Sequence, residues 1–147
     1  MVYFFSKLIG GIDKTMNYFF NYIEKRIQQR VMSEWMGELP VGVSLVFPTP
    51  ENSNFKYLCY SPTMRTPMPV PDSINAYLAM RGALVACQKY EDITTISLPL
   101  LCRGTGLMDI KTILLQIKHA YDTFSTPTER DWKSISQESQ KLNPDAY

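Results

Sequence analysis

One stretch in the second half of the chain, residues 93–124, constrains the fold more than any other. Ile93 to Leu101 is apolar and rich in β-branched residues, which predicts a buried strand. A Gly104-Thr-Gly106 turn follows, and from Asp109 to Phe124 apolar residues recur at steps of three and four, which predicts an amphipathic helix. The order strand, glycine turn, helix is therefore the frame around which the rest of the chain must pack.

This order of elements is also a known kind of anion site. Glycines let the backbone come close to a ligand, and the first N–H groups of a helix favour a phosphate. We therefore expect a phosphate-bearing ligand to contact Arg103, Gly104, Thr105, Gly106 and Leu107. The alternative is a tight connection between strand and helix that binds nothing.

Size and composition indicate one folded domain with a polar tail. The chain has 147 residues, of which 45% are apolar and 20% charged, so it can bury a core and is not of the disordered class. Residues 1–124 form the expected domain. Residues 125–147 form a polar tail, in which a short helix is expected to tuck Trp132 and Ile135 against the domain. The net charge of +1 means that local geometry, rather than overall charge, must hold an anion.

The cysteines and the single histidine predict neither a metal site nor a cofactor. Cys59, Cys87 and Cys102 lack metal-ligand spacing, and His119 is expected to face solvent. Three cysteines without a secretion signal favour a reducing compartment. The apolar start, Met1 to Ile9, is too short to span a membrane and lacks the features of a signal peptide, so we expect a cytoplasmic protein without a membrane partner.

Further elements follow from the same patterns. A helical period runs from Ile12 to Trp35, with a bend expected between Asn21 and Lys25 and a stop at Gly37. The remaining expected elements are strands over Val41–Phe47 and Lys56–Tyr60, joined as a hairpin, and a helix capped by Asp72 that ends near Tyr90.

Helices that alternate with strands predict an α/β fold, in three α/β/α layers around a reduced mixed sheet. Only three strands are well supported, with Val2 to Phe5 as a possible fourth. So thin a sheet suggests an edge that another segment, or a second copy in a homo-oligomer, must cover.

Three blocks of the sequence resemble the macro domain, the ADP-ribose-binding module, in its compact phage, bacterial and viral forms. The first is Gly10-Gly-Ile-Asp-Lys-Thr-Met16 with Gly37-Glu-Leu-Pro-Val-Gly-Val43 after its helix. The second is Ser61-Pro-Thr-Met-Arg65 with Asn75-Ala-Tyr77, and the third runs from Ser97-Leu-Pro99 to Gly104-Thr-Gly106. The likeness extends from about Gly10 to Phe124.

The resemblance implies a function and its residues. In that family two glycine loops clasp the diphosphate and distal ribose of ADP-ribose, or of ADP-ribose carried by a modified protein. The first wall would be Gly10, Gly11, Ile12 and Asp13, the second Arg103 to Leu107, with Pro62 and Thr63 beside them. In hydrolytic members the loop aspartate orients water against the ribose, and Asp13 is the matching position. The family's N-terminal strands, with their Gly-Asp-Ile and Ala-Asn segments, have no counterpart before Gly10. We therefore also expect a second possibility, a degenerate, N-terminally shortened macro fold that serves protein interaction.

Several of these residues have a simpler interpretation that stays open at this point. Asp13 also suits a helix N-cap, a role that needs no substrate. Cys102 beside Arg103 suggests a nucleophile, but a small buried residue that ends a strand explains it better. Arg65 is expected to pair with a surface carboxylate.

Overall fold

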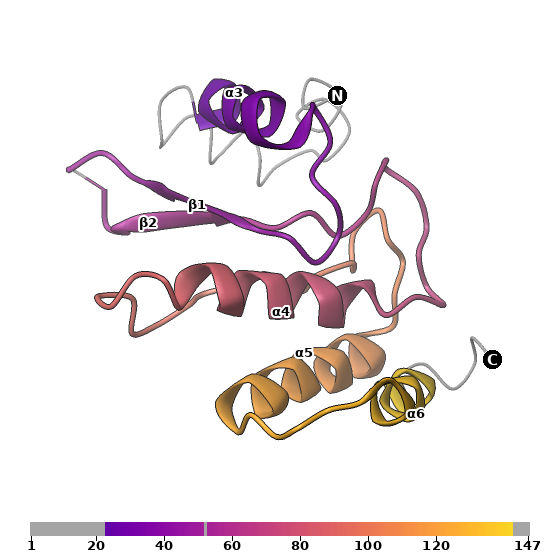
Figure 1. The fold of residues 1–147 in the computed structure, drawn as a ribbon. Helices are drawn as coiled ribbons and strands as arrows, with labels where there is room; N and C mark the ends of the chain where they lie inside the picture. Colours follow the sequence, from indigo (N-terminus) through magenta and orange to yellow (C-terminus); the bar gives the residue numbers. More distant parts are fainter. Residues whose placement is uncertain (1–22, 52, 143–147) are drawn as a thin grey trace.

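The structure, a computed structural model, describes residues 23–51 and 53–142. That part of the chain is mostly helical, with four helices and one antiparallel hairpin. In chain order the elements are α3 (Ile23–Trp35), β1 (Leu45–Pro48), β2 (Tyr57–Tyr60), α4 (Asn75–Cys87), α5 (Ile110–Ser125) and α6 (Trp132–Leu142). The hairpin lies between α3 and α4, with α5 and α6 beyond α4 (Figure 1).

The predicted hairpin is confirmed, although its first strand is shorter than expected. β1 and β2 pair antiparallel, with Leu45 opposite Tyr60. The residues before Leu45 form a turn instead of a strand, because Gly42 has a positive φ of 97° and the Val43 N–H donates to the Pro40 carbonyl at 3.1 Å. Glycine adopts that backbone conformation without a steric penalty.

The helix α3 covers one face of the hairpin. Its buried Ile23, Ile27 and Val31 recur every four residues and pack against Leu45 and Phe47. The predicted stop at Gly37 is confirmed: its φ is 90°, and its N–H donates to the Val31 carbonyl at 3.0 Å, closing the helix end. The predicted helix start at Ile12 and the possible strand at Val2 to Phe5 lie outside the described residues.

The helix α4 covers the opposite face of the hairpin. A Cβ atom added at Gly82 would come within 2.5 Å of the Gly42 carbonyl oxygen, so only glycine allows this close approach. The predicted cap at Asp72 is wrong. The helix begins at Asn75, whose N–H donates to the Ser73 hydroxyl at 3.3 Å. The helix also ends at Cys87, short of Tyr90.

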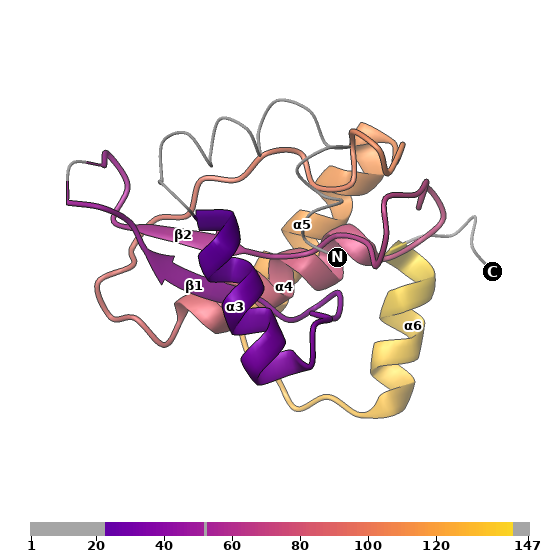
Figure 2. The ribbon, with the colours of Figure 1, turned by 90° about the horizontal axis from the view of Figure 1, so that it is seen from above.

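The helices α5 and α6 complete the core on the far side of α4. Tyr77, Met80 and Leu84 of α4 are buried with Ala120 of α5 and Leu142 of α6, and α6 lies beside α5 (Figure 2). A helix is thus present in the tail, but the predicted tucking of its apolar residues is wrong: Trp132 is 74% exposed and Ile135 47%. The prediction failed because α6 docks through Leu142, which is 3% exposed.

The predicted third strand is wrong. Residues 93–100 belong to no strand and pair with no other segment in the part of the chain that the structure describes. The sheet there is two-stranded and antiparallel, so the three layers around a reduced mixed sheet are not formed by these residues. A strand requires a neighbour for its backbone N–H and C=O groups, and β-branched residues alone do not supply one.

No helix in the described ranges has both the length and the apolar character needed to cross a bilayer.

Candidate functional site

The glycine loop, residues 102–108, is a tight turn. Cys102 and Leu107 adopt left-handed conformations with φ of 62° and 55°. The Met108 N–H donates to the Cys102 carbonyl at 3.1 Å, which closes the turn. A Cβ atom added at Gly106 would lie 2.4 Å from the Cys102 carbonyl oxygen, so glycine is required there by packing alone. Gly106 is therefore explained without a ligand.

Two of the three sequence blocks that resemble the macro domain contact each other at this loop. The Val70 N–H donates to the Gly106 carbonyl at 2.8 Å, and the Cys102 thiol contacts the Thr63 carbonyl at 4.0 Å. The same Thr63 carbonyl accepts a hydrogen bond from Asn75 Nδ2 at 2.8 Å. The half-buried Thr63 thus contacts the start of the glycine loop, while Pro62 before it is buried.

The outer side of the loop is open. Gly104 is exposed, and an added Cβ atom there would meet nothing within 4 Å. The backbone N–H groups of Gly104, Thr105 and Gly106 donate to no acceptor among the described residues. Arg103 is exposed and lies along the loop, donating from Nη1 to the Met108 carbonyl at 3.1 Å. The exposed backbone at Gly104, beside the Arg103 guanidinium, forms a surface that suits an anion.

The start of α5 contributes less than the sequence indicates. Asp109 caps the helix, and its carboxylate accepts from the N–H groups of Lys111 at 2.8 Å and Thr112 at 3.3 Å. These donors are therefore occupied, and the carboxylate adds a negative charge where a phosphate was expected. The expectation that the helix end supplies free N–H groups is wrong for these two residues. Any anion must be held by the loop itself.

The other predicted wall is not described. Gly10, Gly11, Ile12 and Asp13 lie outside the described residues, and so does the choice between a helix cap and a water-orienting role for Asp13.

Two predictions about single side chains hold, the burial of Cys102 and the pairing of Arg65, although the strand that Cys102 was expected to end is not formed by the described residues. Cys102 is 5% exposed, and burial raises the pKa of its thiol to about 11, partly opposed by its hydrogen bond to Thr63. A thiol so reluctant to ionise is a packing residue, not a nucleophile. Arg65 pairs with the carboxylate of Glu38, donating from Nε at 2.6 Å and from Nη2 at 3.1 Å.

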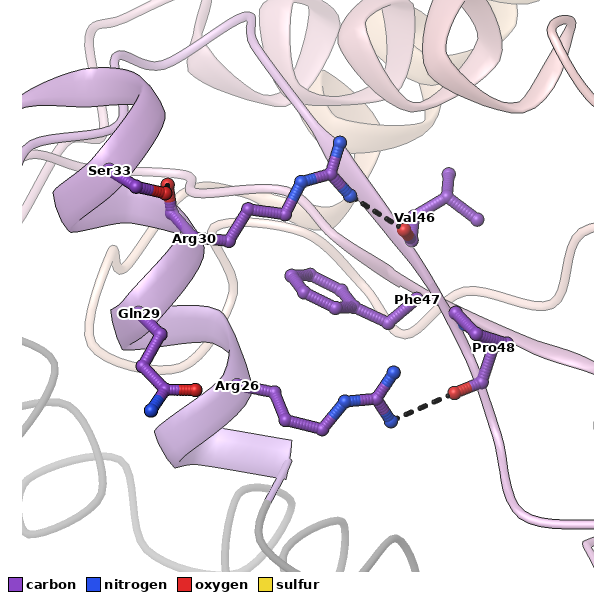
Figure 3. Close-up of a pocket in the computed structure, with 7 residues that line it drawn as sticks. All are labelled: Arg26, Gln29, Arg30, Ser33, Val46, Phe47 and Pro48. Carbon is purple, nitrogen blue, oxygen red and sulfur yellow. Dashed lines mark hydrogen bonds between the residues drawn. The ribbon is translucent and has the colours of Figure 1, made fainter.

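The outer edge of β1 is closed by two arginines whose role the sequence did not reveal (Figure 3). Arg26 donates to the Pro48 carbonyl and Arg30 to the Val46 carbonyl, both at 3.0 Å. Their guanidinium groups also lie 5.9 and 5.4 Å from the centre of the Phe47 ring. Pro48 itself has no N–H to offer a further strand. The spacing of four residues between the arginines on α3 was the available signal.

The edge of β2 is arranged differently. A cavity of about 840 Å³ lies along it, bounded by α3, by α4 and by residues 92–99 and 101. β2 pairs only with β1 in the part of the chain described, so its second edge faces this cavity. Among the described residues, the sheet thus has one edge closed by arginine side chains and one edge, along β2, to which no further strand pairs.

Within the described ranges, no group of three or more histidine, cysteine or acidic side chains is placed to hold a metal ion. Comparison of the chain with protein-family models, with curated proteins and with solved structures finds no match.

Proposed function

We propose that this protein is a macro-domain-like module that binds ADP-ribose, or a related nucleotide diphosphate, through the loop from Arg103 to Leu107. The observation that carries the proposal is the open side of this loop, where Gly104 is exposed with empty space around it. The loop also rests against Thr63, from a second block of the family pattern.

The chemistry follows from these groups. Diphosphate oxygens accept hydrogen bonds from the N–H groups of Gly104 and Thr105, and the Arg103 guanidinium balances part of the charge, while the buried Gly106 allows the tight turn. Because each exposed anionic contact contributes only about 0.3–1 kcal/mol, several must act together. Gly10, Gly11 and Ile12 would supply the opposing wall. If the module is a hydrolase, Asp13 orients water against an ADP-ribose ester or phosphate, and an ADP-ribosylated protein is its partner. A cytoplasmic location suits the three free cysteines.

Two substitutions at one position test this proposal. Gly104→Glu places a carboxylate in the space that the diphosphate would take, whereas Gly104→Ala adds only a methyl group that meets no atom. Calorimetric titration with ADP-ribose should show binding to the wild type and to Gly104→Ala, and none to Gly104→Glu. Absence of heat from the wild type at millimolar ADP-ribose, with the protein folded by circular dichroism, contradicts the proposal.

A second function, protein interaction, is favoured by the edge of β2, which pairs with no further strand in the ranges that the structure describes. We propose as the alternative that an added strand occupies the cavity between β2 and residues 92–101, supplied by a second copy of the chain in a homo-oligomer. Such a strand would pair with the edge of β2 and would give residues 93–100 a neighbouring strand, which no described segment supplies, producing the mixed sheet of a three-layer fold. Arg26 and Arg30 already donate to carbonyl groups on the outer edge of β1, so we expect a further strand to pair with β2 instead.

The oligomeric state tests this alternative. Thr95 is exposed and lines the cavity, so Thr95→Pro removes a backbone donor without disturbing the buried core. Sedimentation should show an oligomer for the wild type and a monomer for Thr95→Pro. A wild type that stays monomeric at every concentration contradicts the alternative, without bearing on the binding of ADP-ribose.

A further inference from the structure

The cavity of about 840 Å³ beside β2 has a largely apolar lining. Apolar side chains reach it from α3, β2, α4 and the segment after α4, and they include Ile27, Leu58, Met80, Ala83, Ile93 and Ile96. Two charged residues of the lining, Lys56 and Asp92, form an ion pair with each other, so neither requires a charged occupant. A cavity of this size and character favours an apolar occupant, because burial of apolar surface is what stabilises such a contact.

The wall that α3 contributes is the start of that helix. Ile23, Glu24 and Ile27 are the residues of α3 that line the cavity, and Ile23 is the residue at which the described chain begins. The 22 residues before Ile23 are therefore joined to the rest of the chain directly at the cavity wall.

The sequence ahead of Ile23 continues the apolar pattern of this wall. Phe19 and Phe20 precede Ile23 by four and three residues, and Ile27 follows it by four. Residues three and four positions apart lie on one side of a helix, so the sequence predicts both rings on the side where Ile23 and Ile27 line the cavity. Since one residue spans at most about 3.6 Å of extended chain, the Cα atom of Phe19 lies within about 14 Å of that of Ile23 in any conformation. Both rings can therefore reach the cavity.

We propose that the cavity is the docking site of the chain's own segment from Tyr18 to Tyr22, with the rings of Phe19 and Phe20 inside it. The occupant belongs to the same chain because it is tethered at the cavity wall. A segment on a short tether has an effective concentration on the order of millimolar, whereas a second copy supplies its segment only at the concentration of the protein in solution.

The inference is independent of the proposed nucleotide site. The cavity is lined by no residue of the glycine loop, residues 102–108, so loss of ADP-ribose binding would leave the docking unchanged. The docked segment does take the place that the alternative function gives to a strand from a second copy. The two occupants exclude each other, and the experiment must show which chain supplies the rings.

NMR spectroscopy of the full-length wild type tests the docking without any substitution. With labelled aromatic rings and methyl groups, nuclear Overhauser contacts are expected from Phe19 and Phe20 to the methyl groups of Met80 and Ile96, which line the cavity. A sample that mixes labelled with unlabelled chains shows whether each contact arises within one chain or between two. We expect contacts within one chain, and no change in their intensity relative to other signals on dilution.

A double substitution supplies a second measurement. Phe19→Ser with Phe20→Ser removes both rings and should empty the cavity. The dye anilinonaphthalene sulfonate fluoresces on exposed apolar surface, so its fluorescence should rise several-fold above that with the wild type. Tyr121→Ser is the matched control and should give the wild-type signal, because Tyr121 is exposed on α5 and does not line the cavity. Circular dichroism shows whether each variant is folded.

Three results would overturn the inference. Contacts of Phe19 and Phe20 that arise only between labelled and unlabelled chains would assign the cavity to a second copy. Absence of contacts from either ring to the residues that line the cavity would show that the rings lie elsewhere. Equal dye fluorescence with the wild type and the folded double variant would show that the cavity is not filled by these rings. If the double variant fails to fold, the contacts in the wild type decide the matter.

Discussion

Gly106 and Gly104 are two residues apart but have opposite physical roles. Gly106 is buried against the backbone of Cys102, and Gly104 faces open space. The sequence predicted both as ligand contacts, because a Gly-Thr-Gly turn gives no indication of which glycine is required for packing. Only the turn geometry, with its hydrogen bond from Met108 to Cys102, separates them.

Alanine at each position measures this difference. Gly106→Ala places a Cβ atom 2.4 Å from the Cys102 carbonyl oxygen and should lower the free energy of unfolding by about 1–3 kcal/mol. Gly104→Ala should change it by less than about 0.5 kcal/mol, as expected for an exposed site. Urea denaturation followed by circular dichroism provides both values. Equal stability of the two variants would show that the turn is not packed as described.

Gln116 is a buried polar residue whose role could not be predicted, because its partners are distant in sequence. Its side-chain oxygen accepts from the Tyr77 N–H at 3.2 Å, and its amide nitrogen donates to the carbonyls of Ser73 at 2.8 Å and Leu142 at 3.3 Å. No side chain at the N-cap of α4 makes a capping hydrogen bond. Gln116 therefore satisfies one of the first N–H groups of that helix from across the core.

Replacing Gln116 by leucine should strongly destabilise the fold. The substitution keeps a similar volume but leaves the buried Tyr77 N–H and the Leu142 carbonyl without this hydrogen bond, and each buried polar group that loses its partner costs about 1–3 kcal/mol. Thermal unfolding of Gln116→Leu measures the loss. Leu115→Ala, at the exposed neighbouring position, is the control and should change little. An unchanged midpoint for Gln116→Leu would contradict the described network.

At the scale of elements, helical periodicity was a better guide than strand propensity. The apolar spacing after Asp109 predicted α5 closely, because a helix makes its own backbone hydrogen bonds. The run from Ile93 to Leu101 predicted a strand that the described chain does not form, since a strand depends on a neighbour that local sequence cannot specify. The prediction of which side of α6 packs against the domain was also wrong. Leu142 is buried and Glu138 lies beside His119 of α5, whereas Trp132 is exposed.

The single histidine of the chain, His119, lies at the contact between α5 and α6. His119 was expected to face solvent, but its ring lies 5.7 Å from that of Tyr77, and its Nε2 is 3.3 Å from Glu138. Burial lowers its pKa, and the Arg130 guanidinium lowers it further. Glu138 would favour the charged ring, but its carboxylate also pairs with Arg130. The more distant charges of Asp122, Lys118 and Lys141 have smaller effects.

This lowered pKa predicts how stability changes with pH. As the pH falls below about 6.5, the unfolded chain takes up a proton on His119 before the folded chain does, so stability is lost through that range and is fully present above it. His119→Asn should remove the loss. The measurement is the urea midpoint at pH 7, 6 and 5 for both proteins. A wild type that gains stability toward pH 5, relative to the variant, would show that Glu138 controls the ring instead.

At the scale of the whole molecule, the described chain contains a hairpin with two unlike edges and a glycine loop, and most of the residues that lead into the loop line the cavity beside β2. The sequence predicted which segments carry the loop and the hairpin, and the structure brings Thr63 and Gly106 into the same neighbourhood. The sequence did not predict that Asp109 would occupy the helix N–H groups, since an aspartate there also suits the predicted helix start. The proposed anion site is therefore limited to the loop.

The most direct measurement is an NMR titration of the isotopically labelled protein with ADP-ribose, observing every backbone amide. We predict that the largest and saturable shifts fall on Gly104 and Thr105, with smaller ones at Gly106 and Thr63, and little change at Lys111 or Thr112. Shifts confined to α5 or α6, or an unchanged spectrum at millimolar ADP-ribose, would contradict it.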